Sequence, residues 1–288
     1  MKSIQTMGMT LGQWIGRGVG QVMFQNNAVA GWLMLLGIAL NAWQLALAAL
    51  MGNVTGSLSA WIVGLDRDAI RQGLYGFNGT LVGLAVGVLF LPSWMSLLLL
   101  FVGSALSVAL VRLFSRWGKL PGYTAPFILA TWLLYGIVVL CCPQYLQTAT
   151  TVAGSESYGF VDAVLCGIGQ VMFQTHPWTG LVFFLALWLS SWRAAVFALI
   201  GSLLPLPVVM ALGVEASAVN LGLLGYNAVL CAMALDDGCS SCWKGVVAAV
   251  FLSVLLQGVG MYAGWLTLTA PFVLATWTVL LVKRWKAE

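Results

Sequence analysis

Long stretches without charge are the feature that most constrains what this chain can fold into. Only 7% of its 288 residues are charged and 61% are hydrophobic, whereas soluble domains carry about 25% charged residues. A membrane crossing needs about 20 apolar residues, so each gap between charges can hold one or two crossings. The sequence therefore predicts an all-α membrane protein of about ten transmembrane helices. The four longest gaps lie between Arg17 and Asp66, Arg71 and Arg112, Lys119 and Glu156, and Lys244 and Lys283.

The chain also contains an internal repeat. GQVMFQ at 20–25 recurs unchanged 149 residues later at 169–174. At the same offset, LYGFN at 74–78 corresponds to LLGYN at 223–227, and TAPFILATW at 124–132 corresponds to TAPFVLATW at 269–277 with an offset of 145. Three blocks in the same order predict two repeats, residues 1–149 and 150–288.

The basic residues predict that the second repeat is inverted. Lys and Arg in short loops mark the cytoplasmic side of a membrane protein, and all twelve fall on one side if each repeat crosses five times. Both termini are then cytoplasmic, and 143–162 is external. Because five is an odd number, the second repeat lies upside down relative to the first. The predicted crossings are 27–50, 51–65, 73–91, 95–111 and 122–142, followed by 177–192, 194–212, 222–235, 245–262 and 265–282.

Several segments look broken or too short to be plain crossings. The stretches 51–65 and 222–235 are short, and Pro126 and Pro271 come early in their helices, where Pro is tolerated. We expect half-helices or unwound turns here, whose free backbone groups are tolerated in a membrane only when buried in protein or lining a cavity. The first 26 residues have no compact apolar region with an A-x-A site, so no cleavable signal peptide is expected.

Nothing in the sequence favours catalysis, a metal or a cofactor. The chain has one histidine, His176, which is more simply explained as an interfacial residue, or as one that supports a neighbouring side chain, than as a proton relay. Cys239 and Cys242 form an isolated C-x-x-C, for which reduced thiols are a simpler explanation than a metal or redox site. No basic stripe with interleaved aromatic residues suggests nucleic acid as a partner.

The duplicated polar residues are neutral. Each has a structural explanation: Gln can join helices by hydrogen bonds, Phe can face lipid, and Thr before Pro can start a helix. Their duplication in order favours a pore on the axis between inverted repeats. Facing aromatic rings with amide, hydroxyl and carbonyl oxygens at their edges suit a small, flat, neutral molecule rich in N–H donors, and they exclude hydrated ions. The paired positions are Gln21 and Gln170, Phe24 and Phe173, Phe77 and Tyr226, and Thr124 and Thr269.

Two acids also align at the 149-residue offset. Asp66 is predicted at the cytoplasmic edge and Glu215 at the outer edge. They could attract a polar solute to the vestibules, or they could be solvated loop charges, and the sequence favours neither reading.

These motifs resemble those of the bacterial urea transporters over nearly the whole chain. The resemblance rests on GLYGFNGTLVG at 73–83, Gln-x-x-Phe at 21–24 and 170–173, and Thr-x-Pro-Phe at 124–127 and 269–272. It implies a passive urea channel of the bacterial inner membrane, a homotrimer with one pore per protomer, surrounded by lipid and without enzymatic activity. The implied slot is lined by Gln21, Phe24, Phe77, Leu81, Thr124, Gln170, Phe173, Tyr226, Leu230 and Thr269.

Two departures from the family pattern make the slot tighter or more polar: Phe173 stands where the family often has an aliphatic residue, and Tyr226 is opposite Phe77. The alternatives are an ion-coupled secondary transporter, a channel for another small neutral solute such as ammonia, water or short amides, and a membrane scaffold without a pore. By contrast with the slot residues, Leu99 is expected to face lipid.

Overall fold

The computed structural model describes residues 2–148, 157–238 and 242–285, with side chains from residue 11 onward. These residues form helices joined by turns, and they contain no β-strand, only an isolated bridge between Phe90 and Leu146. The all-α prediction is confirmed. The predicted features at the Lys2 side chain, Glu156, Cys239 and Lys286 lie outside this description.

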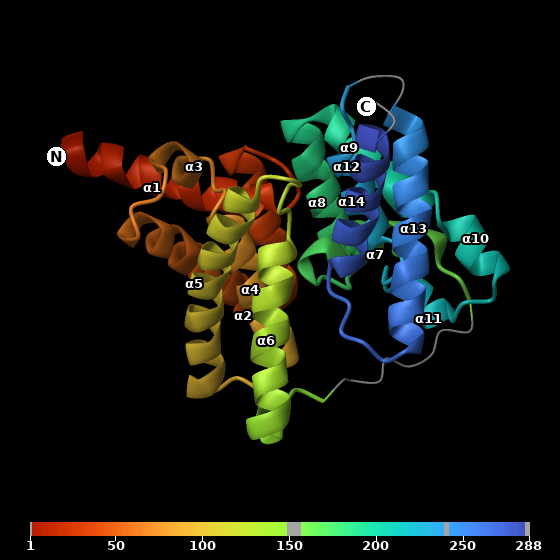
Figure 1. Cartoon of the computed structure of the whole chain (residues 1–288), viewed down its shortest axis with the longest axis horizontal. Coiled ribbons are helices and arrows are strands. Elements are labelled where there is room, and N and C mark those ends of the chain that lie inside the picture. Colours follow the sequence, from red (N-terminus) through yellow and green to blue (C-terminus); the bar gives the residue numbers. More distant parts are fainter. Residues whose placement is uncertain (1, 149–156, 239–241, 286–288) are drawn as a thin grey trace. The chain divides into compact units, whose positions relative to one another are not determined.

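The chain divides into two compact units (Figure 1). The first comprises Met1–Gly122 with Pro126–Ala149, and the second comprises Tyr123–Ala125 with Thr150–Glu288. The main division falls close to residue 149, and the short segment Tyr123–Ala125 belongs with the second unit. That the units are inverted repeats stays a prediction.

The first unit is built around α2, which packs against α1, α4 and α5. After α6, a 3-10 turn, η1, returns the chain to the end of α4, where the Leu91 amide donates to the Tyr145 carbonyl at 2.8 Å. Its elements are α1 (Lys2–Gln21), α2 (Ala28–Ile62), α3 (Arg67–Arg71), α4 (Gly76–Leu89), α5 (Trp94–Trp117), α6 (Ala125–Cys141) and η1 (Pro143–Tyr145).

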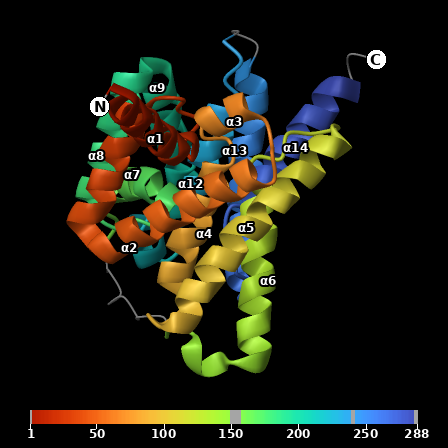
Figure 2. The ribbon, with the colours of Figure 1, turned by 90° about the vertical axis from the view of Figure 1, so that its left-hand side faces the viewer.

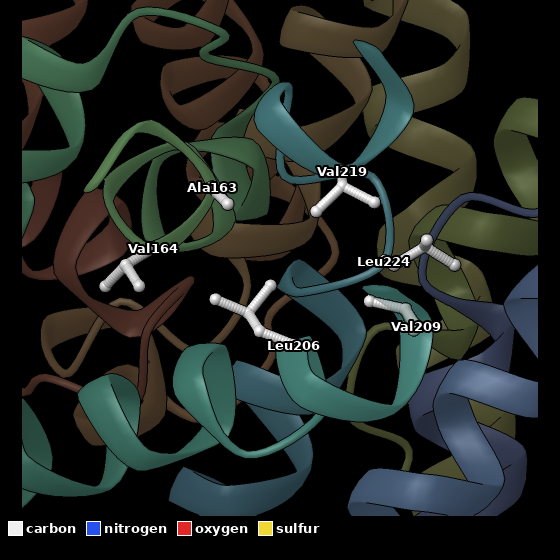
Figure 3. Packing of buried hydrophobic residues seen from close by; sticks show 6 residues of the cluster. All are labelled: Ala163, Val164, Leu206, Val209, Val219 and Leu224. Carbon is white, nitrogen blue, oxygen red and sulfur yellow. The ribbon is translucent and has the colours of Figure 1, made fainter. Parts of the chain in front are cut away.

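The second unit has a similar order of elements, with α12 packed against α9, α13 and α14. Its elements are α7 (Phe160–Gly169), η2 (Gln170–Met172), α8 (Pro177–Ser190), α9 (Trp192–Leu203), α10 (Leu206–Ala211), α11 (Ala216–Asn220), α12 (Tyr226–Ala234), α13 (Trp243–Tyr262) and α14 (Ala270–Trp285). Figure 3 shows one core of this unit, in which α7, α10, α11 and the turn before α12 bring together Ala163, Val164, Leu206, Val209, Val219 and Leu224.

Four described segments are long and apolar enough to cross a membrane: α2, α5, α9 with α10, and α13. Four others are apolar but shorter, namely α4, α6, α7 with η2, and α8. The chain is a multi-pass membrane protein, and the number of ten crossings stays a prediction. Leu99 was wrongly assigned to the lipid face, because it is 8% exposed, whereas the adjacent Leu98 is 49% exposed.

The predicted break between 50 and 51 is wrong. The helix α2 runs on to Ile62, and its one non-helical residue is Ala42, with φ −151° and ψ 86°. In the second unit the corresponding break is Ser191, with φ −158° and ψ 110°, which separates α8 from α9. Ser191 stands 149 residues after Ala42, so the repeat offset locates a break that hydropathy missed.

Glycine allows neighbouring helices to touch at the backbone. A Cβ on Gly31 of α2 would collide with the Gly16 carbonyl of α1, and a Cβ on Gly180 of α8 would collide with the Leu165 carbonyl of α7. These two glycines are also 149 residues apart. Each unit therefore joins its first two helices by the same kind of close approach.

Candidate functional site

The duplicated Gln-x-x-Phe motif lies where the first helix of each unit ends. Gln21 is the last residue of α1, and Gln170 begins the 3-10 turn after α7. The turn after each helix contains a phenylalanine in the left-handed backbone conformation, since Phe24 and Phe173 each have φ 59°. A bulky side chain at positive φ costs of order 1–3 kcal/mol and persists where the surrounding structure enforces it. Two identical outliers at matched positions mark these turns as a candidate site.

A second glutamine in the same motif holds each turn closed, and the sequence reasoning missed it. The side-chain amide of buried Gln25 donates to the Met23 carbonyl at 2.9 Å, and that of buried Gln174 donates to the Met172 carbonyl at 3.0 Å. The predicted Gln21 is half-buried and donates to the Gln72 carbonyl at 3.0 Å. The sequence did contain a sign of this role, because Gln25 and Gln174 belong to the repeated hexapeptide.

Asn78 and Asn227 support the start of the last long helix of each unit, a role that was also missed. The Asn78 side-chain carbonyl accepts from the Phe127 amide at 3.1 Å, and that of Asn227 accepts from the Phe272 amide at 3.1 Å. Both asparagines are fully buried. The first backbone amides of a helix have no hydrogen-bond partner within the helix. Pro126 and Pro271 have no N–H, and each asparagine accepts the hydrogen bond of the amide that follows the proline.

Thr124 and Thr269 are brought together within the second unit. Their hydroxyl oxygens lie 2.8 Å apart and hydrogen-bond to each other, and the two residues are only 2% and 4% exposed. The Tyr123 ring packs against the Phe272 ring with centroids 5.2 Å apart. Since 2.8 Å leaves no room for a solute between the hydroxyls, they form one continuous polar spot rather than two facing walls.

Tyr226 differs from its counterpart Phe77 in a way that the structure explains. Its hydroxyl donates to the Leu268 carbonyl at 2.6 Å and lies 3.3 Å from the Gln257 side-chain oxygen. The Asn227 side chain also donates to that Gln257 oxygen, at 3.2 Å. The hydroxyl is thus engaged inside the unit, and it reinforces the turn at Leu268, whose φ is 48°.

The remaining predicted residues lie on the short helices or at their ends. Phe77 and Leu81 are on α4, and Leu230 is on α12, with both leucines fully buried. That these residues share one slot with Phe24, Phe173 and the threonines stays a prediction.

The two aligned acids have local roles. Exposed Asp66 begins α3, where its carboxylate accepts from the Ala69 amide at 2.9 Å. Exposed Glu215 precedes α11 and accepts from the Ser217 hydroxyl. Both are therefore helix-start residues, and their vestibule role stays a prediction.

Possible metal ligands and reactive side chains are dispersed in the described part of the chain. It contains no cluster of three or more His, Cys, Asp or Glu side chains that could hold a metal. Exposed His176 begins α8 and accepts from the Trp178 amide at 3.3 Å, in line with an interfacial role. The five described cysteines, Cys242 among them, are free thiols.

A multi-pass helical membrane protein with an internal repeat and duplicated buried polar groups is typical of the class of small-solute transport proteins. A family model described as "Urea transporter" matches residues 12–284, and the chain belongs to the urea transporter family. The resemblance drawn from the motifs is confirmed.

Two relatives illustrate the match. The chain is 33% identical to Urea transporter 1 of Rattus norvegicus over 239 residues, which is 77% of this chain and 62% of that protein. It is 30% identical to Urea transporter 1 of Ovis aries over 293 aligned residues, which is 93% of this chain and 76% of that protein. The aligned part is therefore less than two thirds of the rat protein. These relatives are transporters by name, in agreement with the expectation that the chain is not an enzyme.

Proposed function

We propose that this chain is a channel through which urea crosses the membrane passively and selectively. The proposal rests on membership of the urea transporter family and on one structural observation, the buried hydroxyl pair of Thr124 and Thr269 at 2.8 Å. A charged or coupled site would need buried ionisable groups, and the duplicated buried groups here are threonine, asparagine and glutamine.

The hydroxyl pair suits a solute with several N–H donors. Each hydroxyl has one donor and two acceptor lone pairs, so after the mutual hydrogen bond the pair offers more acceptors than donors. Urea must lose most of its water in an apolar slot, and fixed oxygens return about 1 kcal/mol net per hydrogen bond. Hydrated ions gain too little there to replace their shells.

The walls of the proposed slot are aromatic. Phe24 and Phe173 lie in the turns after α1 and α7, each with a left-handed backbone conformation. Phe77 is the second residue of α4, and Tyr226 is the first residue of α12. With its hydroxyl engaged by the Leu268 carbonyl, Tyr226 contributes a ring face much as Phe77 does, so the slot is less polar than the sequence suggests. Leu81 and Leu230 complete the apolar lining, and Gln21 and Gln170 supply amide oxygens.

The rest of the proposal follows the family resemblance. The chain forms a homotrimer with one pore per protomer in the bacterial inner membrane, with both termini in the cytoplasm. Asp66 and Glu215 lie at the two vestibules, where carboxylates attract a solute with N–H donors.

Flux in proteoliposomes tests the passive mechanism. Urea should equilibrate down its own gradient without added ions or membrane potential, and stopped-flow light scattering should record faster equilibration than in empty vesicles. Accumulation above the outside concentration that depends on Na⁺ or a proton gradient would instead establish the alternative, an ion-coupled transporter. Parallel assays with acetamide and ammonia show whether another neutral solute is preferred.

A further inference from the structure

An apolar groove on the first unit is lined by α1, the second half of α2 and α3. Figure 2 shows these three helices side by side. The groove has a volume of about 300 Å³. Among the residues that line it are Leu11, Trp14, Val54, Leu58, Trp61 and Ile70. Ser57 also borders it, and its hydroxyl is buried without a hydrogen-bond partner.

The second unit fills the matched positions with its own side chains. At the 149-residue offset, Trp14, Ser57 and Ile70 correspond to Ala163, Leu206 and Val219, which meet in the core shown in Figure 3. The helix α9 ends at Leu203, just before Pro205, and the chain then continues as α10, which supplies Leu206 and Val209.

The first unit lacks this filling because α2 does not end at the matched position. The position matched to Pro205 is Gly56, and α2 continues through it to Ile62. Proline removes a backbone donor and clashes with the preceding turn, whereas glycine does neither. The groove is thus specific to the first unit.

Arginines lie at the α3 edge of the groove. Arg67 and Arg71 flank the groove residue Ile70 on α3, and the Arg17 guanidinium of α1 donates to the Arg71 carbonyl at 3.3 Å. The acids here are Asp68, which pairs with Arg71 at 3.3 Å in an exposed contact, and Asp66, which begins α3.

From the next helix, Val108 of α5 packs against Ile70, and Arg112 lies one turn beyond it. The four arginines outnumber the two acids, so this edge is basic. The positions matched to Arg17, Arg67 and Arg71 in the second unit are Cys166, Ala216 and Asn220, which carry no positive charge. The open groove and the basic edge therefore occur together in one unit and are both missing from the other.

We infer that this groove is a binding site for one anionic phospholipid of the surrounding bilayer. An acyl chain fills the groove beside Trp14 and Trp61, and the headgroup phosphate meets Arg17, Arg67 and Arg71. Tryptophan favours the membrane interface and arginines near it attract anionic headgroups. A second copy of the chain fits less well, because its apolar surface would cover the arginines without neutralising them.

Native mass spectrometry of the detergent-purified chain tests this site with phosphatidylglycerol and phosphatidylcholine of identical acyl chains. The wild type should retain phosphatidylglycerol in preference to phosphatidylcholine. Arg67→Ala, which introduces the residue found at the matched position 216, should weaken phosphatidylglycerol binding about fivefold, the effect of one surface arginine. Val54→Phe should weaken the binding of both lipids, because the larger side chain fills the groove.

Matched controls separate the site from general effects. Lys244→Ala removes a basic residue of the second unit, and Val29→Phe makes the same enlargement at an exposed position of α2. Both should bind as the wild type does. Equal retention of the two lipids by the wild type, or unchanged retention in Arg67→Ala, overturns the inference. A change of oligomeric mass in Val54→Phe with lipid retention intact also overturns it and assigns the groove to a subunit contact.

Discussion

At the scale of single residues, the buried polar side chains of this protein mostly hold the backbone in place. Gln25 and Gln174 close the left-handed turns, and Asn78 and Asn227 satisfy the first amides of α6 and α14. Thr124 and Thr269 are different, because their hydroxyls bond to each other. That leaves acceptor capacity for a solute, which is why the proposed function depends on them.

Thr124→Val should slow urea permeation. Valine keeps the shape of the side chain but removes a hydroxyl, so urea loses one hydrogen bond at its most dehydrated point. The barrier should rise by about 1–2 kcal/mol, roughly a tenfold slowing. Stopped-flow urea flux, normalised to folded protein by size-exclusion chromatography, measures the effect. The control is Leu98→Ala at an exposed position of α5, and equal rates in the two intact variants would remove Thr124 from the pore.

At the scale of helices, the shape of each unit depends on where helices end and how closely they approach. The left-handed Phe24 and Phe173 reverse the chain after α1 and η2. The next helix then returns against the first with glycine at the contact, Gly31 in one unit and Gly180 in the other. Helices in a membrane gain little from the hydrophobic effect between them, so small residues and close packing are their main source of association.

Gly31→Ala should destabilise the first unit strongly. The added methyl group meets the backbone carbonyl of Gly16, which cannot move aside as a flexible side chain could. Overpacking of this kind costs about 1–3 kcal/mol or more. Thermal unfolding in detergent measures the loss. The control is Gly136→Ala in α6, where nothing lies within 4 Å of the new Cβ, and it should be neutral or slightly stabilising. Equal melting temperatures would contradict the close helix approach.

At the scale of the whole molecule, charge distribution is the main guide to orientation in the membrane. Arg67 and Arg71 are the first and last residues of α3, and Arg112 lies on α5. Lys283 and Arg284 lie in the last turn of α14. The positive-inside rule predicts that both clusters are cytoplasmic. With the predicted five crossings per unit, this assignment predicts that the second unit is inverted relative to the first.

Cysteine labelling tests this topology. In a variant whose six native cysteines are replaced by alanine, Gln147→Cys should react with an impermeant maleimide added outside intact cells, and Ser115→Cys should react only after permeabilisation. Both positions are exposed, so access to the reagent depends on the side of the membrane. The reverse pattern would contradict the inverted repeat.

The sequence by itself determined the class of the protein and its paired motifs. A chain with so few charges cannot cover its surface with polar groups, and the duplicated blocks are visible as letters, so the all-α membrane class and the urea transporter family followed from local information. The sequence also placed Pro126 and Pro271 early in their helices, where the missing N–H of proline is tolerated, and α6 and α14 begin one residue before them.

Only the tertiary structure decided which polar groups are engaged and which space is filled. The break at Ala42 lies inside an apolar run that hydropathy cannot divide, and the engagement of the Tyr226 hydroxyl depends on Leu268, 42 residues away. The first unit has an open groove where the second has a filled core. In the second unit α9 ends just before Pro205, whereas in the first unit α2 continues through the matched position. Contacts between residues distant in sequence set these outcomes, and hydropathy and spacing carry no information about them.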